Sequence, residues 1–265
     1  MQAGKNLENQ LDRYRACMKL RLDKRVVDQG LAASRTRAQQ RIFAGQIAVD
    51  GSVVTKAGLL IDAQQSVQAI EEDNPYVSRG GLKLATAFDV WKIDIAGRTC
   101  LDIGISTGGF SDCMLQRGAA CVVGVDSGHS QLAEKLRSDS RLLLLEHTNA
   151  RHLTPDMLRP GIGFFTVDVS FIAASLILPA VIAAAFPSKA AGSLHEAVIL
   201  VKPQFEAGKE FVGKGGIVHS AAAHQRALER VTHTVNTHGA LETRVMDSPI
   251  PGGDGNREFL MYARF

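Results

Sequence analysis

The stretch Leu101–Phe110 combines residue types that could hold a small ligand against backbone groups. Its apolar start, its three glycines and the helical spacing that follows predict a strand, a tight turn and the first turn of a helix. Glycines at such a turn let a ligand approach backbone N–H groups near the partly positive start of a helix. The spacing differs from G-x-G-x-x-G, so the turn does not fit the dinucleotide fingerprint. A turn that serves only compact packing is the alternative interpretation.

Two acidic residues flank this turn in the predicted fold. Asp102 stands two positions before the first glycine, and Asp126 ends the next apolar run, Cys121–Asp126. Carboxylates suit a positively charged ligand better than a pyrophosphate, and this favours a site for S-adenosylmethionine. We expect Asp126 to accept hydrogen bonds from the ribose hydroxyls and Asp102 to lie near the amino-acid end. The predicted cofactor-binding residues are Asp102, Gly104, Ser106, Thr107, Gly108, Gly109, Phe110, Asp126 and Asp168.

A second pair of ionisable residues, Asp168 and Lys202, ends two later apolar runs. An aspartate and a lysine at strand ends could activate a hydroxyl group, which is a poor nucleophile while it is protonated. The ammonium lowers the pKa of the hydroxyl, and the carboxylate orients the lysine and helps to remove the proton. A buried salt bridge without a catalytic role is the alternative.

The elements that must position these residues alternate along the chain from Gly97 onward. Alternating strand-like and helix-like segments predict an α/β domain with a parallel sheet and crossover helices, completed by an antiparallel pair of strands. The expected strands are 98–103, 121–126, 141–146, 164–168, 197–202, 242–248 and 258–265, and the expected helices are 84–91, 110–117, 131–138, 175–186 and 221–237. Ligands of such sheets bind beyond the carboxyl ends of the strands, where all four ionisable residues named above are expected to lie.

A smaller α+β unit is predicted in residues 19–70. It begins with a helix from Lys19, continues with a second helix over 35–44 that Ser34 caps, and ends with short strands that include a hairpin at Asp50-Gly51. Residues 1–18 are expected to form a flexible leader, residues 71–82 a linker, and residues 83–265 the larger domain.

Basic residues recur on this small unit and predict an RNA-binding role. Arg35, Arg37 and Arg41 are expected to form a positive stripe along the second helix, which would bind phosphates without reading a base sequence. A solvated helix face is the alternative. The predicted RNA-binding residues are Arg21, Lys24, Arg35, Arg37, Arg41 and Arg79.

Length and composition are those of a globular protein. The chain has 265 residues, 45% of them hydrophobic, and a net charge of +3, so partners must be inferred from where the charges lie. Its four cysteines have no C-x-x-C or metal-ligand spacing; they predict buried thiols in a reducing compartment and no metal site. The sequence shows no signal peptide and no apolar run long enough to span a bilayer, and we therefore expect a cytoplasmic protein.

Five motifs, in order, resemble those of a known family. They are Tyr76-Val-Ser-Arg-Gly-Gly-Leu-Lys-Leu84, Asp102-Ile-Gly-Ile-Ser-Thr-Gly-Gly-Phe110, Asp168-Val-Ser-Phe171, Val201-Lys-Pro-Gln-Phe-Glu206 and Gly255-Asn-Arg-Glu-Phe259. Residues 19–70 resemble the S4-type RNA-binding domain. Together these segments are similar to the TlyA (hemolysin A-like) family, whose members join an S4-type domain to an FtsJ-like methyltransferase domain. The resemblance implies a Rossmann-like class I methyltransferase sheet preceded by a small α+β S4-type domain.

The resemblance also implies an activity. Members of the family transfer a methyl group from S-adenosylmethionine to a ribose 2′-hydroxyl of ribosomal RNA, with cytidine as the expected nucleotide. The implied partner is ribosomal RNA or a ribosomal subunit, without a membrane, and the expected state is a monomer. Matched motif by motif, the implied catalytic tetrad is Lys83, Asp168, Lys202 and Glu258.

Two departures from the family pattern leave other functions open. Ile105 stands where members usually carry alanine, and Ser111 stands where threonine is common. A bulkier residue in the turn could tighten or weaken cofactor binding, so an RNA-binding protein that holds the cofactor without turnover is one alternative. A membrane-lysing protein, as the hemolysin name suggests, is a remote one. It would need an amphipathic or membrane-spanning segment, and none is visible in the sequence.

Overall fold

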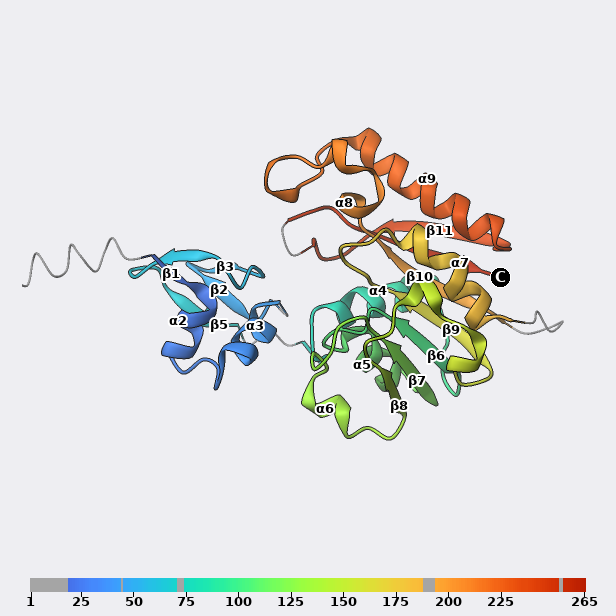
Figure 1. Ribbon diagram of the computed structural model, residues 1–265, viewed down its shortest axis with the longest axis horizontal. Helices are drawn as coiled ribbons and strands as arrows, with labels where there is room; N and C mark the ends of the chain where they lie inside the picture. The colour runs from blue at the N-terminus through green and yellow to red at the C-terminus, as the bar shows by residue number, and fades with distance from the viewer. Residues whose placement is uncertain (1–18, 44, 71–73, 188–193, 253–254) are drawn as a thin grey trace, which may run out of the picture. The chain divides into compact units, whose positions relative to one another are not determined.

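The computed structural model describes residues 19–43, 45–70, 74–187, 194–252 and 255–265. The chain divides into two compact units, an N-terminal unit up to Asp73 and a C-terminal unit from Asn74 to Phe265 (Figure 1). The expected leader, residues 1–18, lies outside the described residues. Of the expected linker, residues 71–73 also lie outside them, and its end belongs to the first helix of the C-terminal unit.

The N-terminal unit pairs two helices with two small sheets. Its helices are α2 (Leu22–Asp28) and α3 (Arg35–Phe43). One sheet joins β1 (Lys19–Arg21) to β4 (Leu60–Asp62), and the other has the order β3 (Ser52–Val53), β2 (Ile47–Val49), β5 (Val67–Ala69). Leu22, Val26, Ile42 and Ile61 are among the residues of its own buried core.

Local signals explain most of these elements. The Ser34 hydroxyl accepts a hydrogen bond from the backbone N–H of Arg37 at 3.3 Å, which confirms the predicted cap of α3. Asp50 and Gly51 have φ values of 49° and 78°, as a two-residue hairpin of type I′ requires. The expectation of a helix from Lys19 is wrong for its first turn. Residues 19–21 instead pair antiparallel with β4, which satisfies their backbone groups before α2 begins.

The C-terminal unit is built on a seven-stranded sheet in the order β11-β12-β10-β9-β6-β7-β8. Its strands are β6 (Thr99–Ile103), β7 (Cys121–Val125), β8 (Leu142–Leu145), β9 (Ile162–Val167), β10 (Glu196–Val201), β11 (Glu242–Asp247) and β12 (Phe259–Arg264). Neighbours from β10 to β8 run parallel, and β12 lies antiparallel to both β10 and β11. The predicted sheet and its antiparallel completion are confirmed.

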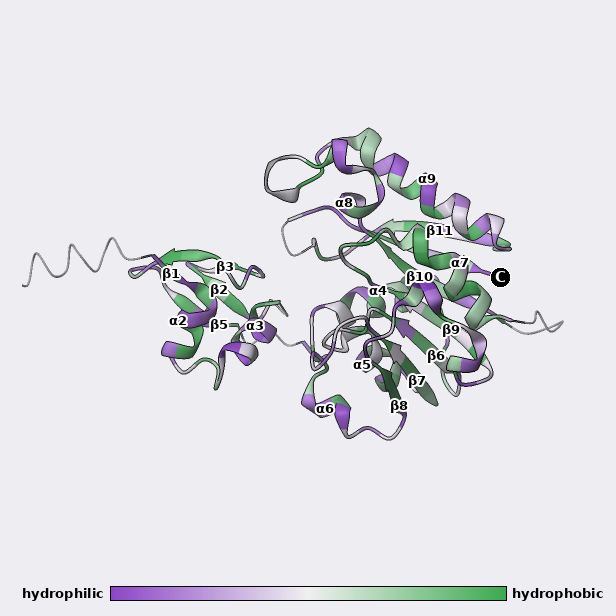
Figure 2. Cartoon of the chain, viewed as in Figure 1, coloured by the Kyte–Doolittle hydropathy of each residue, from purple (hydrophilic) through white to green (hydrophobic). Residues whose placement is uncertain are grey.

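Helices cover both faces of this sheet because successive strand residues enter opposite cores. Phe164 packs with the core under α4 (Gly80–Trp91), α5 (Gly109–Gln116) and α6 (Glu134–Arg137), whereas Phe165 packs with the core under α7 (Ala174–Ala185) and α9 (Ala221–Thr237). Figure 2 shows hydrophobic residues along the strands and alternating hydrophobic and hydrophilic bands along α9. The remaining helical segments are α8 (Pro203–Glu206), η1 (Ala150–His152), η2 (Pro155–Met157), η3 (Lys209–Phe211) and η4 (Lys214–Gly216).

Two helices of the C-terminal unit differ from their expected bounds by more than one residue. α4 begins at Gly80, four residues earlier than expected, and this places Lys83 in its first turn. α6 covers only Glu134–Arg137 of the expected 131–138. The segment before it is held by the predicted cofactor turn, residues 104–109, because the Ala133 N–H donates to the Thr107 carbonyl at 3.1 Å. The order of the strands reverses between β6 and β9, and ligands of such sheets bind at that point, beyond the carboxyl ends.

Candidate active site

Sheet register brings three ionisable residues to one edge. Asp168 directly follows β9, and Lys202 directly follows β10. Val201, the last residue of β10, pairs with Phe259, the first residue of the antiparallel β12. Glu258 therefore reaches the same carboxyl edge as Lys202, although it precedes its strand rather than following it.

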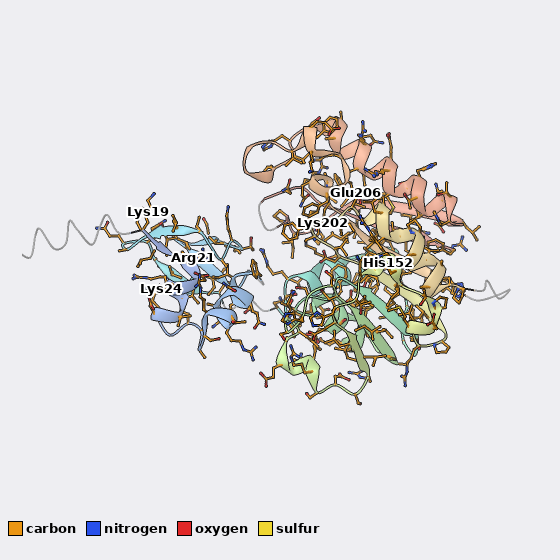
Figure 3. All side chains as sticks on the ribbon, viewed as in Figure 1. Lys19, Arg21, Lys24, His152, Lys202 and Glu206 are labelled. Atoms are coloured by element: carbon orange, nitrogen blue, oxygen red, sulfur yellow. The ribbon has the colours of Figure 1, made fainter. Side chains whose placement is uncertain are left out.

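The four side chains form two ion pairs. The Lys83 Nζ, from the first turn of α4, lies 2.6 Å from the Glu258 Oε2, and the Lys202 Nζ lies 2.7 Å from the Asp168 Oδ1. Lys202 also donates a hydrogen bond to the Ser170 hydroxyl at 3.0 Å. Figure 3 labels Lys202, together with Glu206 of α8 after it. The structure thus brings together all four residues of the predicted tetrad.

Attraction to neighbouring charged side chains keeps Asp168 and Lys202 charged. Burial raises the pKa of Asp168, but the nearby Lys202 and Lys83 outweigh burial and hold it below its usual value. Burial lowers the pKa of Lys202, and here the attraction of Asp168 and Glu258 outweighs burial and raises it. Asp168 and Lys202 are therefore each stabilised in the charged form by the other and by a residue of the second pair.

The two pairs differ in their access to solvent. The side chains of Lys202 and Asp168 are 12% and 26% exposed, whereas those of Lys83 and Glu258 are 11% and 4% exposed. The carboxylate of Asp168 is thus the most accessible of the four groups. The two lysine side chains are equally buried, so the pairs differ in the exposure of their carboxylates.

The predicted cofactor turn lies between β6 and α5. Gly104 has a φ of 84°, and a Cβ there would lie 2.2 Å from the carbonyl oxygen of Asp168, so only glycine fits between the ends of β6 and β9. The exposed Ser106 has a φ of 47° and donates its backbone N–H to the Asp126 Oδ2 at 2.9 Å. The Gly128 N–H donates to the Asp126 Oδ1 at 2.7 Å. Asp126 is therefore fixed at the end of β7, half-buried beside the turn.

Asp102 lies in β6, just before the turn, and is 1% exposed. Its Oδ2 accepts a hydrogen bond from the Ser111 hydroxyl at 2.6 Å, and its Oδ1 accepts one from the Thr166 hydroxyl at 2.8 Å. Burial raises the pKa of Asp102 to about 6, although both hydroxyls oppose that shift. Through these two hydrogen bonds, Asp102 links α5 to β9. Its partner in β9, Thr166, lies two residues before Asp168 in the sequence.

The other predicted cofactor residues surround the start of α5. Thr107 is half-buried, Gly108 precedes the helix with a φ of 95°, and Gly109 is its first residue. A Cβ at Gly109 would lie 2.2 Å from the Ser78 hydroxyl oxygen, so the chain ahead of α4 packs tightly on this helix. Phe110 is 4% exposed and packs in the core. It supports the turn from below.

The departure at Ile105 does not enter the exposed part of the turn. Its side chain is 4% exposed and belongs to the core under α4 and α5. It packs over Gly124 of β7, where a Cβ would lie 2.3 Å from the Ile105 Cδ1. The extra bulk is therefore accommodated inside the core, next to a glycine.

This edge fits S-adenosylmethionine by the chemistry of its donors and acceptors. A fixed, half-buried carboxylate ends β7, a glycine-rich turn exposes backbone at the start of an eight-residue helix, and Asp168 is close by. Acidic groups on both sides suit a ligand with a sulfonium and an ammonium. Within the described residues, no group of three or more His, Cys, Asp or Glu side chains could hold a metal ion.

The predicted RNA-binding residues have different environments. Arg21 and Arg35 both pair with Asp23, at 2.9 Å and 3.0 Å. An α-helix turns about 100° per residue, so Arg37 and Arg41 share a face of α3 while Arg35 lies on another side. Arg37 contacts Gln40, and Arg41 donates to the Leu31 carbonyl at 2.5 Å. The expected single stripe is thus divided. Lys24 and Arg79 have no ion pair within the described part of the chain.

Sequence reasoning missed one exposed aromatic residue at the edge. Phe171, three residues after Asp168, is 94% exposed with a φ of 65°, and its ring centroid lies 5.7 Å from that of Phe205. Its place in the Asp168–Phe171 motif was the only signal in the sequence. A backbone in the left-handed region, which is uncommon for a bulky side chain, thus holds this ring out of the core.

Known families and proteins match the chain along most of its length. The S4 domain family matches residues 20–67, and the FtsJ-like methyltransferase family matches residues 76–265. The 16S/23S rRNA (cytidine-2′-O)-methyltransferase TlyA of Mycobacterium tuberculosis is 40% identical over 92% of this chain and 89% of its own. Hemolysin A of Brachyspira hyodysenteriae is 38% identical over 92% and 99%.

A solved structure also resembles both units of the chain. It comes from Streptococcus thermophilus, carries the provisional name of hemolysin, and is 40% identical with a TM-score of 0.68 over 93% of this chain and 88% of its own. Two of these relatives thus have hemolysin names. Among the helices that the structure describes, none is long and apolar enough to cross a membrane.

Proposed function

This chain belongs to the TlyA family of S4-domain, FtsJ-like methyltransferases, and from that premise we propose that it transfers a methyl group from S-adenosylmethionine to a ribose 2′-hydroxyl of ribosomal RNA. The proposed nucleotide is a cytidine, as the name of the relative from Mycobacterium tuberculosis states for that protein. The observation that carries the proposal is the convergence of Lys83, Asp168, Lys202 and Glu258 at the carboxyl edge of the sheet.

The proposed roles follow from charge and access. S-adenosylmethionine supplies, when it is bound, a methyl group that is open to in-line attack by a hydroxyl oxygen. Lys202, kept protonated by Asp168 and Glu258, lowers the pKa of the incoming hydroxyl. Asp168 orients the Lys202 Nζ, accepts the hydrogen bond of the hydroxyl and takes up the proton that the hydroxyl releases.

We infer that the more deeply buried Lys83–Glu258 pair supports the Lys202–Asp168 pair. Lys83 helps to keep Asp168 ionised, and Glu258 helps to keep Lys202 protonated. Both effects act through space on groups that meet the substrate. Loss of either residue should therefore slow methyl transfer more than it weakens binding.

The proposed cofactor contacts come from the two strand ends beside the turn. The Asp126 carboxylate can accept hydrogen bonds from the ribose hydroxyls, since two backbone N–H groups already fix its orientation. The turn residues 104–109 offer backbone groups at the start of α5. Asp102 would influence the amino-acid end of the ligand from below the turn, by its charge and through Ser111.

The proposed RNA contacts come from both units. Arg21, Lys24, Arg35, Arg37 and Arg41 would bind phosphates from the N-terminal unit, and Arg79 from the start of α4. Phe171 offers an exposed ring beside Asp168, and stacking of one base on such a ring contributes about 1–3 kcal/mol.

A ribose-methylation map of ribosomal RNA from cells with and without the gene tests the proposal. At least one 2′-O-methylated cytidine should be lost without the gene and should return with the wild-type gene but not with Lys202→Ala. Identical maps would refute the proposed activity. Cofactor binding by the purified chain without single-turnover transfer to the ribosomal subunits of the knockout cells would favour the inactive RNA-binding protein instead.

A further inference from the structure

The N-terminal unit contains a buried carboxylate, Asp23, that accepts hydrogen bonds from two arginines of the proposed RNA contacts and from Gln39. Asp23 is 0% exposed. It accepts hydrogen bonds from the Arg21 Nε at 3.1 Å and from an Arg21 terminal nitrogen at 2.9 Å. It also accepts from the Arg35 Nε at 3.0 Å and from the Gln39 side-chain amide at 3.0 Å.

Each arginine gives Asp23 only part of its hydrogen-bonding capacity. Their side chains remain 47% and 59% exposed, and a guanidinium has five N–H donors in a planar fork. Arg35 uses its Nε, so both of its terminal nitrogens stay available on the outside. Arg21 keeps the nitrogen that does not face Asp23. The two partly exposed cations are thus held on one anion; Arg21 is labelled in Figure 3.

Asp23 stays ionised among these hydrogen-bond donors. The hydrogen bond from Arg21 lowers its pKa far below the usual range and outweighs the opposing effect of burial; the bonds from Gln39 and Arg35 lower it further. The two arginines and the carboxylate together carry a net charge of +1, which balances the single negative charge of one phosphodiester. A loose pair of arginines would repel each other and would have to lose side-chain entropy on binding.

We propose that Asp23 is a positioning residue that fixes Arg21 and Arg35 as a preorganised clamp for one RNA phosphate. This rests on the proposed function, because the RNA contact belongs to it. The clamp joins β1 and α3, which are distant in sequence, so it sets both the spacing and the direction of the two guanidinium groups. A bidentate guanidinium matches the geometry of phosphate oxygens, whereas a lysine ammonium does not.

The effect of Asp23→Asn separates positioning from net charge. The variant makes the unit more positive by one charge, so a binding mode that depends on charge alone predicts tighter RNA binding. The clamp predicts weaker binding, by about tenfold, and a salt dependence whose slope falls by about one unit for the lost phosphate contact. Asp50→Asn is the matched control, since Asp50 is a carboxylate of the same unit that accepts from Gln65 and the Ser66 N–H instead of arginines.

A second pair of variants conserves the charge and tests the clamp even if Asp23→Asn does not fold. Arg35→Lys keeps the charge but cannot bind Asp23 and a phosphate in one plane, so we expect about tenfold weaker binding. Arg25→Lys is its control, because Arg25 of α2 donates to the Ala63 carbonyl and does not contact Asp23. Binding is measured on the full chain with fluorescently labelled fragments of 16S and 23S ribosomal RNA, at several salt concentrations and below the melting temperature of each variant.

The outcomes are distinct. Weaker binding by both Asp23→Asn and Arg35→Lys, with unchanged controls, supports the clamp. Tighter or unchanged binding by Asp23→Asn in a folded chain overturns it, and so does an Arg35→Lys variant that binds as well as the wild type. If Asp23→Asn unfolds the unit, Arg35→Lys decides alone. A wild-type chain that binds neither RNA would instead refute the proposed function.

Discussion

The Lys202→Ala substitution tests the assignment of roles within the active site most directly. It removes the cation that is expected to lower the pKa of the ribose hydroxyl, and it leaves the carboxylate of Asp168 without its partner at 2.7 Å. Group transfer that loses a positioned acid–base partner slows by about 10²–10⁴-fold. Cofactor affinity should change little, because Lys202 contacts Asp168 and Ser170 rather than the turn.

The expected cost in stability follows from the exposure of each pair. The side chain of Asp168 is 26% exposed, so water can solvate it after Lys202 is lost, and we expect a cost of about 1 kcal/mol. Lys83→Ala leaves Glu258, with a side chain only 4% exposed, as an unpaired buried charge, and that costs about 3–5 kcal/mol. One kcal/mol shifts the melting temperature of a domain of this size by roughly 2–4 °C.

The assay combines melting curves with single-turnover methyl transfer at low temperature, where every variant is folded. Lys202→Ala should melt close to the wild type and transfer almost no methyl groups, whereas Lys83→Ala should melt much earlier and retain some transfer. Arg117→Ala is the control for loss of a surface pair, since its side chain is 39% exposed and lies 2.9 Å from Asp89, which is 63% exposed. Variants that unfold early yet transfer at the normal rate would refute the catalytic interpretation of these residues.

Three further outcomes are expected. Asp126→Ala removes the acceptors for the ribose hydroxyls and should weaken cofactor binding by about 1–3 kcal/mol in calorimetry; unchanged affinity would contradict the assigned contact. A chain that lacks the residues up to Asp73 should stay folded and bind the cofactor, because the cores of the C-terminal unit contain no residue of the N-terminal unit. It should lose RNA methylation in moderate salt, and transfer at the full rate would contradict the RNA-binding role of the N-terminal unit. Burial raises the pKa of Asp102 to about 6, so its contribution to stability is fully present below its unfolded pKa near 4 and is lost as the pH rises through 6, by about 3 kcal/mol. Asp102→Asn should flatten this part of the stability profile, and identical profiles between pH 4 and 7 would show that Asp102 does not titrate there.

The sheet and half of the candidate site could be predicted from local patterns. Apolar runs that end in Asp168 and Lys202 identified two strands of a parallel sheet, and the rule that ligands bind beyond carboxyl ends placed both residues at one edge. The convergence of Lys83 with Glu258 depends on contacts between residues 175 positions apart, which no local pattern records. Only the resemblance to a family indicated these two residues.

The N-terminal unit shows why charge patterns alone mislead. Arg35 was expected to form a stripe with Arg37 and Arg41, but its orientation is decided by Asp23, which comes from another helix. Lys19–Arg21 has a sequence compatible with helix, yet pairing with β4 decides its conformation. The two errors have different causes. The helical period of 100° per residue already separates Arg35 from Arg37 and Arg41. The conformation of Lys19–Arg21 instead depends on β4, a partner that is distant in the sequence, while propensity describes only neighbours.

Glu258→Gln would show whether a buried carboxylate in the active site also acts by positioning and by tuning its neighbours. The substitution keeps the shape of the side chain and makes the cluster one charge more positive, so charge alone predicts that the hydroxyl is activated at least as well. The geometry predicts the opposite: Lys83 loses its partner at 2.6 Å, and Lys202 loses one of the two carboxylates that raise its pKa. The basic limb of the pH profile for single-turnover transfer should therefore move to lower pH, and the rate at its plateau should fall. Transfer that is equal or faster, with an unmoved basic limb, would mean that Glu258 serves the fold and not the reaction.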